Sequence, residues 1–189
     1  MEVALSLPVF DQAKMGQRKP EYLIWTALCK AMGIRSYVEL GTGSGHYLLD
    51  AGIEKVIGVD VNHTNTNERH NFYQDARVCC VSGDSHDLQT LHDVLTLLDG
   101  PPDAVFIDAD HSYDAVRQDF DMWYPAARKL IGFHDILIPD VARFWNEISL
   151  GITSAKIIGC DCASAYSWQG PGAPSDGVLS GGGIGVIFK

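Results

Sequence analysis

The sequence is poor in positive charge. Its 14 lysines and arginines stand against 24 aspartates and glutamates, which gives a formal net charge of −10 at pH 7. Proteins bind polyanions through clustered lysines and arginines, and no such cluster stands in the chain. The charge balance therefore excludes a general electrostatic attraction to nucleic acid or to an anionic membrane, and we expect neither as a partner.

Long apolar runs are also absent. No stretch approaches the ~18 apolar residues that a membrane-spanning helix requires. The first residues, Met-Glu-Val-Ala-Leu, have neither the basic segment nor the apolar core of a secretory signal. These two absences lead us to expect a cytoplasmic protein.

Cysteine is scarce and irregularly placed. The chain has 5 cysteines, and their spacing is typical of no recognised zinc site. We interpret them as reduced thiols. A metal held by Cys160 and Cys162 is the less favoured alternative.

The chain does contain short apolar runs that alternate with helical patterns. We expect strands at residues 36–40, 55–59, 77–81, 104–107, 130–133, 154–158 and 183–189, and helices at 20–32, 46–51, 86–97, 113–129 and 139–148. Such alternation is typical of an α/β protein with a mostly parallel sheet. Residues 1–19 are weakly patterned and indicate a mobile arm, and residues 159–182 are rich in glycine, serine and proline and indicate a long loop.

A glycine-rich turn follows the first expected strand. Residues 37–45 read Tyr-Val-Glu-Leu-Gly-Thr-Gly-Ser-Gly, so that Glu39 stands two positions before three alternating glycines. Glycine permits such a turn and lets the backbone lie against a small molecule. The lysine of a phosphate-binding loop is absent, and the spacing differs from the dinucleotide motif Gly-x-Gly-x-x-Gly. A plain strand-to-helix connection is the alternative.

Polar residues also end the next three expected strands. Asp60 follows the second, with the apolar Val61 next to it, Asp84 and Ser85 follow the third, and Asp108 ends the fourth. Ligands of open α/β sheets bind at the carboxyl ends of the strands, where an acidic residue can accept hydrogen bonds from ribose hydroxyls. We therefore expect these residues to line one nucleoside pocket. Each aspartate could instead cap a following helix.

The densest polar clusters follow the fourth and fifth expected strands. The first contains Asp108, Asp110 and His111, and the second is His134-Asp135. If the two strands are neighbours, their ends lie about 5 Å apart, and two carboxylates at that distance repel unless one is protonated or a cation lies between them. A divalent metal resolves the repulsion, and oxygen ligands favour Mg²⁺ over softer ions. The alternative is that Asp110 or Asp135 caps a helix and His134 is a buried structural residue.

Two segments resemble a known family. The pattern Glu39-Leu-Gly41-Thr42-Gly43-Ser-Gly45 resembles the first motif of class I S-adenosylmethionine-dependent methyltransferases. Residues 103–136 resemble the branch that includes macrolide-sugar O-methyltransferases and cephalosporin-hydroxylase-like proteins. This resemblance implies a Rossmann-like, doubly wound sheet, mostly parallel with a C-terminal antiparallel strand, in a single methyltransferase-like domain spanning residues 1–189.

The resemblance also implies roles for individual residues. S-adenosylmethionine would contact ten of them, namely Glu39, Gly41, Thr42, Gly43, Gly45, Asp60, Val61, Asp84, Ser85 and Asp108. Asp108 and His111 match a metal ligand and a catalytic base of the family, and Asp108, His134 and Asp135 are the expected metal ligands. Where the family usually has two acidic ligands, this chain has His134-Asp135, so it departs from the pattern at His134.

We therefore expect an S-adenosylmethionine-dependent methyltransferase that methylates a hydroxyl of a small-molecule acceptor with the help of a divalent metal. A homo-oligomer is compatible with this expectation. Three alternatives remain open: a relative with other metal-dependent chemistry such as hydroxylation, a non-catalytic nucleoside-binding module, and a metal-dependent hydrolase.

Overall fold

The computed structural model describes residues 19–42, 52–61, 75–157 and 182–189. Several sequence predictions lie outside these ranges. They are residues 1–18 of the arm predicted at 1–19, the helix at 46–51, residues 159–181 of the loop predicted at 159–182 together with Cys160 and Cys162, and the glycines Gly43 and Gly45.

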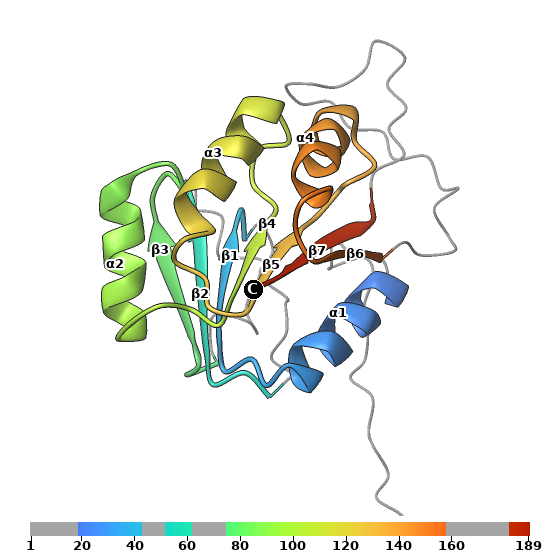
Figure 1. Cartoon of the computed structure of the whole chain (residues 1–189). Coiled ribbons are helices and arrows are strands. Elements are labelled where there is room, and N and C mark those ends of the chain that lie inside the picture. Colours follow the sequence, from blue (N-terminus) through green and yellow to red (C-terminus); the bar gives the residue numbers. More distant parts are fainter. Residues whose placement is uncertain (1–18, 43–51, 62–74, 158–181) are drawn as a thin grey trace, which may run out of the picture.

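A seven-stranded sheet forms the centre of the described chain, in the order β3-β2-β1-β4-β5-β7-β6 (Figure 1). The strands are β1 (Ser36–Leu40), β2 (Lys55–Asp60), β3 (Val78–Ser82), β4 (Ala104–Ile107), β5 (Leu130–Phe133), β6 (Ser154–Ile157) and β7 (Ile184–Phe188). Strands β1 to β5 pair in parallel, whereas β7 runs antiparallel to both β5 and β6. The predicted mostly parallel sheet with a C-terminal antiparallel strand is confirmed.

Helices cover both faces of the sheet. They are α1 (Lys19–Ala31), α2 (Leu88–Leu98), α3 (Tyr113–Trp123) and α4 (Pro139–Ser149). Because side chains alternate between the two faces of a strand, Val38 and Leu40 of β1 pack with α2, α3 and α4, whereas Tyr37 packs with Trp25 of α1. The sheet is therefore doubly wound, as predicted.

The ends of two helices show how local chemistry sets the boundaries. Helix α2 begins at Leu88, two residues later than predicted, because the Asp87 side chain caps it by accepting a hydrogen bond from the backbone N–H of Gln89. Helix α3 ends at Trp123, so the predicted extent of 113–129 was wrong at its end. Pro125 supplies no backbone N–H with which the helix could continue.

Two further findings bear on the expectations above. Of the cysteines that the structure describes, Cys29 and Cys79 are free thiols. In the same ranges, no helix has both the length and the apolar character needed to cross a membrane.

Candidate functional site

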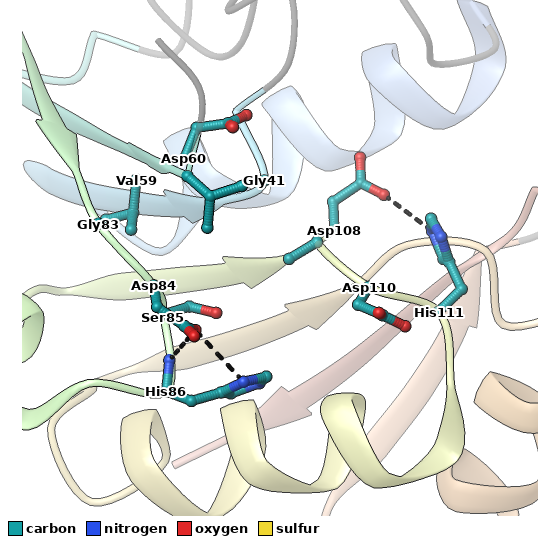
Figure 2. A pocket seen from close by; sticks show the side chains of 12 residues that line it. Gly41, Val59, Asp60, Gly83, Asp84, Ser85, His86, Asp108, Asp110 and His111 are labelled. Atoms are coloured by element: carbon teal, nitrogen blue, oxygen red, sulfur yellow. Dashed lines mark hydrogen bonds and ion pairs between the residues drawn. The ribbon is translucent and has the colours of Figure 1, made fainter. Parts of the chain in front are cut away.

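A pocket of about 530 Å³ lies at the carboxyl ends of four neighbouring parallel strands (Figure 2). Its wall consists of Gly41 after β1, residues 59–61 of β2 and the turn behind it, residues 83–86 after β3, and residues 108–111 after β4. The structure thus brings Asp60, Val61, Asp84, Ser85 and Asp108 together around one pocket, as expected from the sequence. Their convergence follows from the strand order, because β3, β2, β1 and β4 are adjacent and parallel.

Gly41 lets the ends of β1 and β4 meet. Its φ is +77°, and an added Cβ would lie 2.2 Å from the carbonyl oxygen of Asp108. The backbone N–H of Gly41 donates to Val59 O at 2.8 Å, and that of Asp108 donates to Leu40 O at 3.0 Å. Only glycine combines this conformation with so close a backbone approach.

Two predicted cofactor residues lie beneath the pocket rather than in its wall. Thr42 is buried, and its hydroxyl lies 3.2 Å from Glu39 O and 3.4 Å from Val59 O. Glu39 is 1% exposed and faces the Tyr37 hydroxyl at 3.5 Å. Burial, together with the negative charge of Asp108, raises the pKa of Glu39 well above its usual value. Both side chains are therefore buried, and neither lines the pocket.

Asp108, which lines the pocket, lies near Asp135 because β4 and β5 are paired. The Nε2 atom of His111 lies 3.4 Å from Asp108 Oδ1 and 3.2 Å from Asp135 Oδ2. The Nδ1 atom of His134 lies 3.1 Å and 3.4 Å from the same two oxygens. Two imidazole rings thus bridge two carboxylates that would otherwise repel each other.

The charges of this cluster support one another. Burial opposes a charge on His111, but Asp108 and Asp135 outweigh it and raise the pKa of His111 to about 10. Burial likewise opposes a charge on His134, and the same carboxylates raise its pKa well above the usual value. Burial alone would raise the pKa of Asp135, yet the two histidines hold that pKa far below its ordinary value. The cluster is stable only when positive charge lies between its carboxylates.

The donor set fits a divalent cation. Asp108, His111 and Asp135 each offer one ligand atom, and these atoms lie within 4.8 Å of one another. His134 contacts the same two carboxylate oxygens, but its ring is buried and its Nε2 faces Glu21 Oε2 at 4.0 Å. His111 lines the pocket and its side chain is 19% exposed. The ring predicted to act as the base thus faces the pocket, and the ring predicted as a ligand lies behind it.

Neither aspartate caps the helix that follows it, and Ser112 occupies the N-cap position of α3 without a side-chain bond. Asp110 accepts from the backbone N–H of Ser112, the residue that precedes α3, at 2.7 Å, and this bond lowers the pKa of Asp110. Asp135 does not cap α4, since Ile138 occupies the N-cap position without a side-chain bond. Asp135 adopts a positive φ of 54° and accepts from the backbone N–H of Gly182. Its backbone is held in an uncommon conformation beside the cluster.

Three residues near the site were not singled out from the sequence. His86 lines the pocket directly after Asp84 and Ser85, which is the one signal that could have identified it. Glu21 accepts from the backbone N–H of Gly183 at 2.8 Å and faces His134. Asp119 is fully buried beside His86. Glu21 and Asp119 stand in helices far along the chain from their neighbours, where no motif marks them.

The fold and the pocket define an open α/β protein with a small-molecule site at the carboxyl edge of its sheet. The methyltransferase domain family matches this chain over residues 38–136, which is more than half of its 189 residues. The chain belongs to that family. The match spans the glycine turn, the pocket wall and both acidic clusters, and it confirms the family expected from the sequence.

Solved structures of methyltransferases share this fold. TomG, an O-methyltransferase from Streptomyces achromogenes solved with SAM, is 16% identical over 90% of this chain and 80% of TomG, with a TM-score of 0.60. An O-methyltransferase from Bacillus cereus solved with SAH is 18% identical over 97% of this chain and 84% of its own, with a TM-score of 0.59. Cofactor-bound Rv0187 from MTB is 17% identical over 97% and 83%, with a TM-score of 0.64. At such identities the likeness shows a shared fold. No curated protein sequence matches the chain.

Proposed function

We propose that this protein transfers the methyl group of S-adenosylmethionine to a hydroxyl of a small molecule, with a divalent cation beside the acceptor oxygen. The observation that carries the proposal is that Asp108 and His111, which form a charged cluster with Asp135, line the same pocket as Asp60 and Asp84. One pocket thus offers a nucleoside-binding wall and a charged centre for chemistry.

The nucleoside wall supports the cofactor. Asp60 at the end of β2 can accept from ribose hydroxyls, and Asp84 after β3 can accept from the exocyclic amine of adenine. Gly41 lines the same pocket and presents no side chain to it. Asp108 borders this space and the charged centre alike, so it lies where the methionine part of the cofactor and the acceptor would meet.

The charged centre supports transfer to oxygen. A neutral hydroxyl is a weak nucleophile, and a bound cation would lower its pKa and orient it towards the methyl group. Asp108 and Asp135 would hold the cation. The pocket wall would align the acceptor oxygen with the sulfonium, since an in-line displacement depends on positioning.

One imidazole would complete the cation site, and the other would accept the proton. We assign His134 to the cation, because it contacts both carboxylates from the buried side, and His111 to the proton, because it faces the pocket. Without a cation the two carboxylates keep His111 protonated, so His111 would act as a base only once a bound cation had taken over the positive charge between them. General bases of this kind contribute roughly 10²–10⁴-fold to a rate. The second candidate is the reverse assignment, in which His111 binds the cation and His134 accepts the proton. It is favoured by the close grouping of the ligand atoms of Asp108, His111 and Asp135.

Calorimetric titration of the protein with S-adenosylmethionine and S-adenosylhomocysteine, with Mg²⁺ or with a chelator, tests the proposal. We expect both nucleosides to bind, and methyl transfer to a panel of hydroxylated acceptors to require the metal. If neither nucleoside gives a heat of binding, the proposal is overturned. Nucleoside binding without turnover on any acceptor would favour a non-catalytic module, and metal-dependent oxidation of an acceptor would favour hydroxylase-like chemistry.

The two histidines can be separated by their variants. His111→Ala should lower turnover by roughly 10²–10⁴-fold while Mg²⁺ affinity changes little. His134→Ala should weaken Mg²⁺ binding first. If His111→Ala instead abolishes Mg²⁺ binding and His134→Ala does not, the roles are reversed.

A further inference from the structure

The turn after β3 is attached to helix α3 by three contacts. The indole N–H of Trp123 donates to the carbonyl of Ser85 at 2.9 Å. The Nε2 atom of His86 lies 3.2 Å from the carbonyl oxygen of Ala115 and 3.4 Å from Oδ1 of Asp119. Both residues of the turn also line the pocket (Figure 2). Helix α3 therefore determines where this part of the pocket wall stands.

Asp119 is an unusual component of that attachment. Its side chain is 0% exposed, and its polar neighbours are the side chain of Ser85, whose hydrogen bond lowers the pKa of Asp119, and the ring of His86. Burial raises the pKa of Asp119 to about 6. A buried carboxylate costs free energy unless it is paired. Its neighbour on the same helix, Asp121, is 64% exposed and pairs with Arg117 in the ordinary way.

His86 connects this buried carboxylate to the pocket. Its Nδ1 atom lies 3.3 Å from Asp84 Oδ1, and its backbone N–H donates to the same oxygen at 2.9 Å (Figure 2). The imidazole thus stands between two carboxylates, with Asp119 behind it and Asp84 in front. The Asp84 side chain is 62% exposed, so it retains accepting capacity for a ligand. The ring of His86 thus links the buried Asp119 to this acceptor, which the backbone N–H of His86 also holds.

We propose that Asp119 and His86 are positioning residues that set the Asp84 carboxylate against the 6-amino group of the cofactor's purine, and so make the site select adenine over hypoxanthine. This inference rests on the proposed function. An amine donates two hydrogen bonds, and a carboxylate accepts them. The 6-oxo group of hypoxanthine would place an acceptor against an acceptor, which leaves both oxygens unpaired in the pocket.

The test compares the dissociation constants of S-adenosylhomocysteine and S-inosylhomocysteine, which differ at position 6 of the purine. We expect the wild-type protein to prefer the adenosyl compound by roughly 10- to 100-fold, the discrimination that one unsatisfied polar pair supports. In Asp119→Leu and in His86→Phe, the preference should fall by about tenfold. This fall should come from weaker binding of the adenosyl compound, while the affinity for the inosyl compound stays within about threefold.

Two further variants control the experiment. Asp119→Asn keeps an acceptor oxygen at the same place and should retain most of the preference. Asp121→Asn, on the exposed side of α3, should leave both constants unchanged. If Asp119→Leu does not fold, His86→Phe decides the matter, because its side chain stands at the pocket surface and is 27% exposed.

Each remaining outcome has one meaning. Equal weakening of both nucleosides in Asp119→Leu and His86→Phe would show a purely structural role and overturn the inference. A wild-type protein that binds the two compounds equally would also overturn it, while the proposed function would stand. A wild-type protein that binds neither compound would overturn the proposed function itself.

Discussion

Asp108 and Asp135 come from neighbouring strands and share two histidines, because His111 and His134 each contact Oδ1 of Asp108 and Oδ2 of Asp135 at 3.1–3.4 Å. The two strands place the carboxylates at the same edge of the sheet, and positive charge must lie between them. A proton on an imidazole and a divalent cation both meet this requirement. Under the proposed function, a divalent cation would take the place of a proton in this geometry.

Asp135→Asn should separate the metal from the cofactor. Asparagine tolerates the positive φ of Asp135 and can still accept from Gly182, but it removes the charge that holds a cation. We expect Mg²⁺ affinity to fall by roughly tenfold or more and turnover to fall by about 10²-fold, while S-adenosylhomocysteine binds within about threefold of wild type. Calorimetry and a methyl-transfer assay measure these quantities.

The matched control for that variant is Asp140→Asn, an exposed aspartate in the first turn of α4. It removes the same charge at the surface and should change neither the affinity for Mg²⁺ nor the affinity for S-adenosylhomocysteine. If Asp135→Asn retains wild-type Mg²⁺ dependence, Asp135 does not hold the metal.

Gly41→Ala should damage both stability and cofactor binding, and Gly52→Ala should damage stability alone. Both glycines have a φ of +77°, so alanine at either position costs about 1–2 kcal/mol of backbone strain. At Gly52 nothing lies within 4 Å of an added Cβ, whereas at Gly41 the Cβ would collide with the backbone of Asp108 and Ala109. Thermal melts and nucleoside titrations of the two variants isolate the effect of the collision, because only Gly41→Ala produces it. Equal losses of stability and of nucleoside affinity in the two variants would show that the collision is relieved at no cost.

Stability between pH 4 and pH 6 should depend on Asp119. Its pKa is raised from about 3.8 to about 6 by burial, so the folded protein binds this proton more tightly than the unfolded chain. The resulting stabilisation is present at low pH and is lost as the pH rises through about 6, by on the order of 3 kcal/mol. Urea unfolding of wild type and Asp119→Asn across this range should show a slope that the variant lacks. If the free energies of unfolding of the two proteins change with pH in the same way, Asp119 is not the source of the slope.

Asp103 should stabilise the fold without affecting the site. It stands before β4, at the edge of the sheet opposite the pocket, and is buried while accepting from the backbone N–H of Arg35 at 2.8 Å and from Arg128 at 2.9 Å. Asp103→Ala leaves these donors unpaired, which should lower the free energy of unfolding by about 3 kcal/mol. The affinity of the folded fraction for S-adenosylhomocysteine should be unchanged, and a specific loss of nucleoside binding would show that the two edges of the sheet are coupled.

Much of the fold was predictable because its signals are local. The strands at 36–40, 104–107 and 130–133 coincide with β1, β4 and β5, since short apolar runs bounded by turns are read directly from the residues. The end of α3 at Trp123 was misjudged because the apolar pattern continues past Pro125, and the missing N–H outweighs that pattern. The convergence of Asp60, Asp84 and Asp108 was also predictable, because parallel strands bring their carboxyl ends to one edge.

The sequence by itself determined the family, the α/β class and the identity of the charged residues, because motifs and periodicity lie in residues close together along the chain. Only the tertiary structure decided which histidine faces the pocket, that Glu39 and Thr42 lie beneath it, and that Asp119 and Glu21 stand behind it. Each of these relationships joins residues from different elements, and it exists only after the sheet has brought β4 beside β5 and the helices have packed onto their two faces.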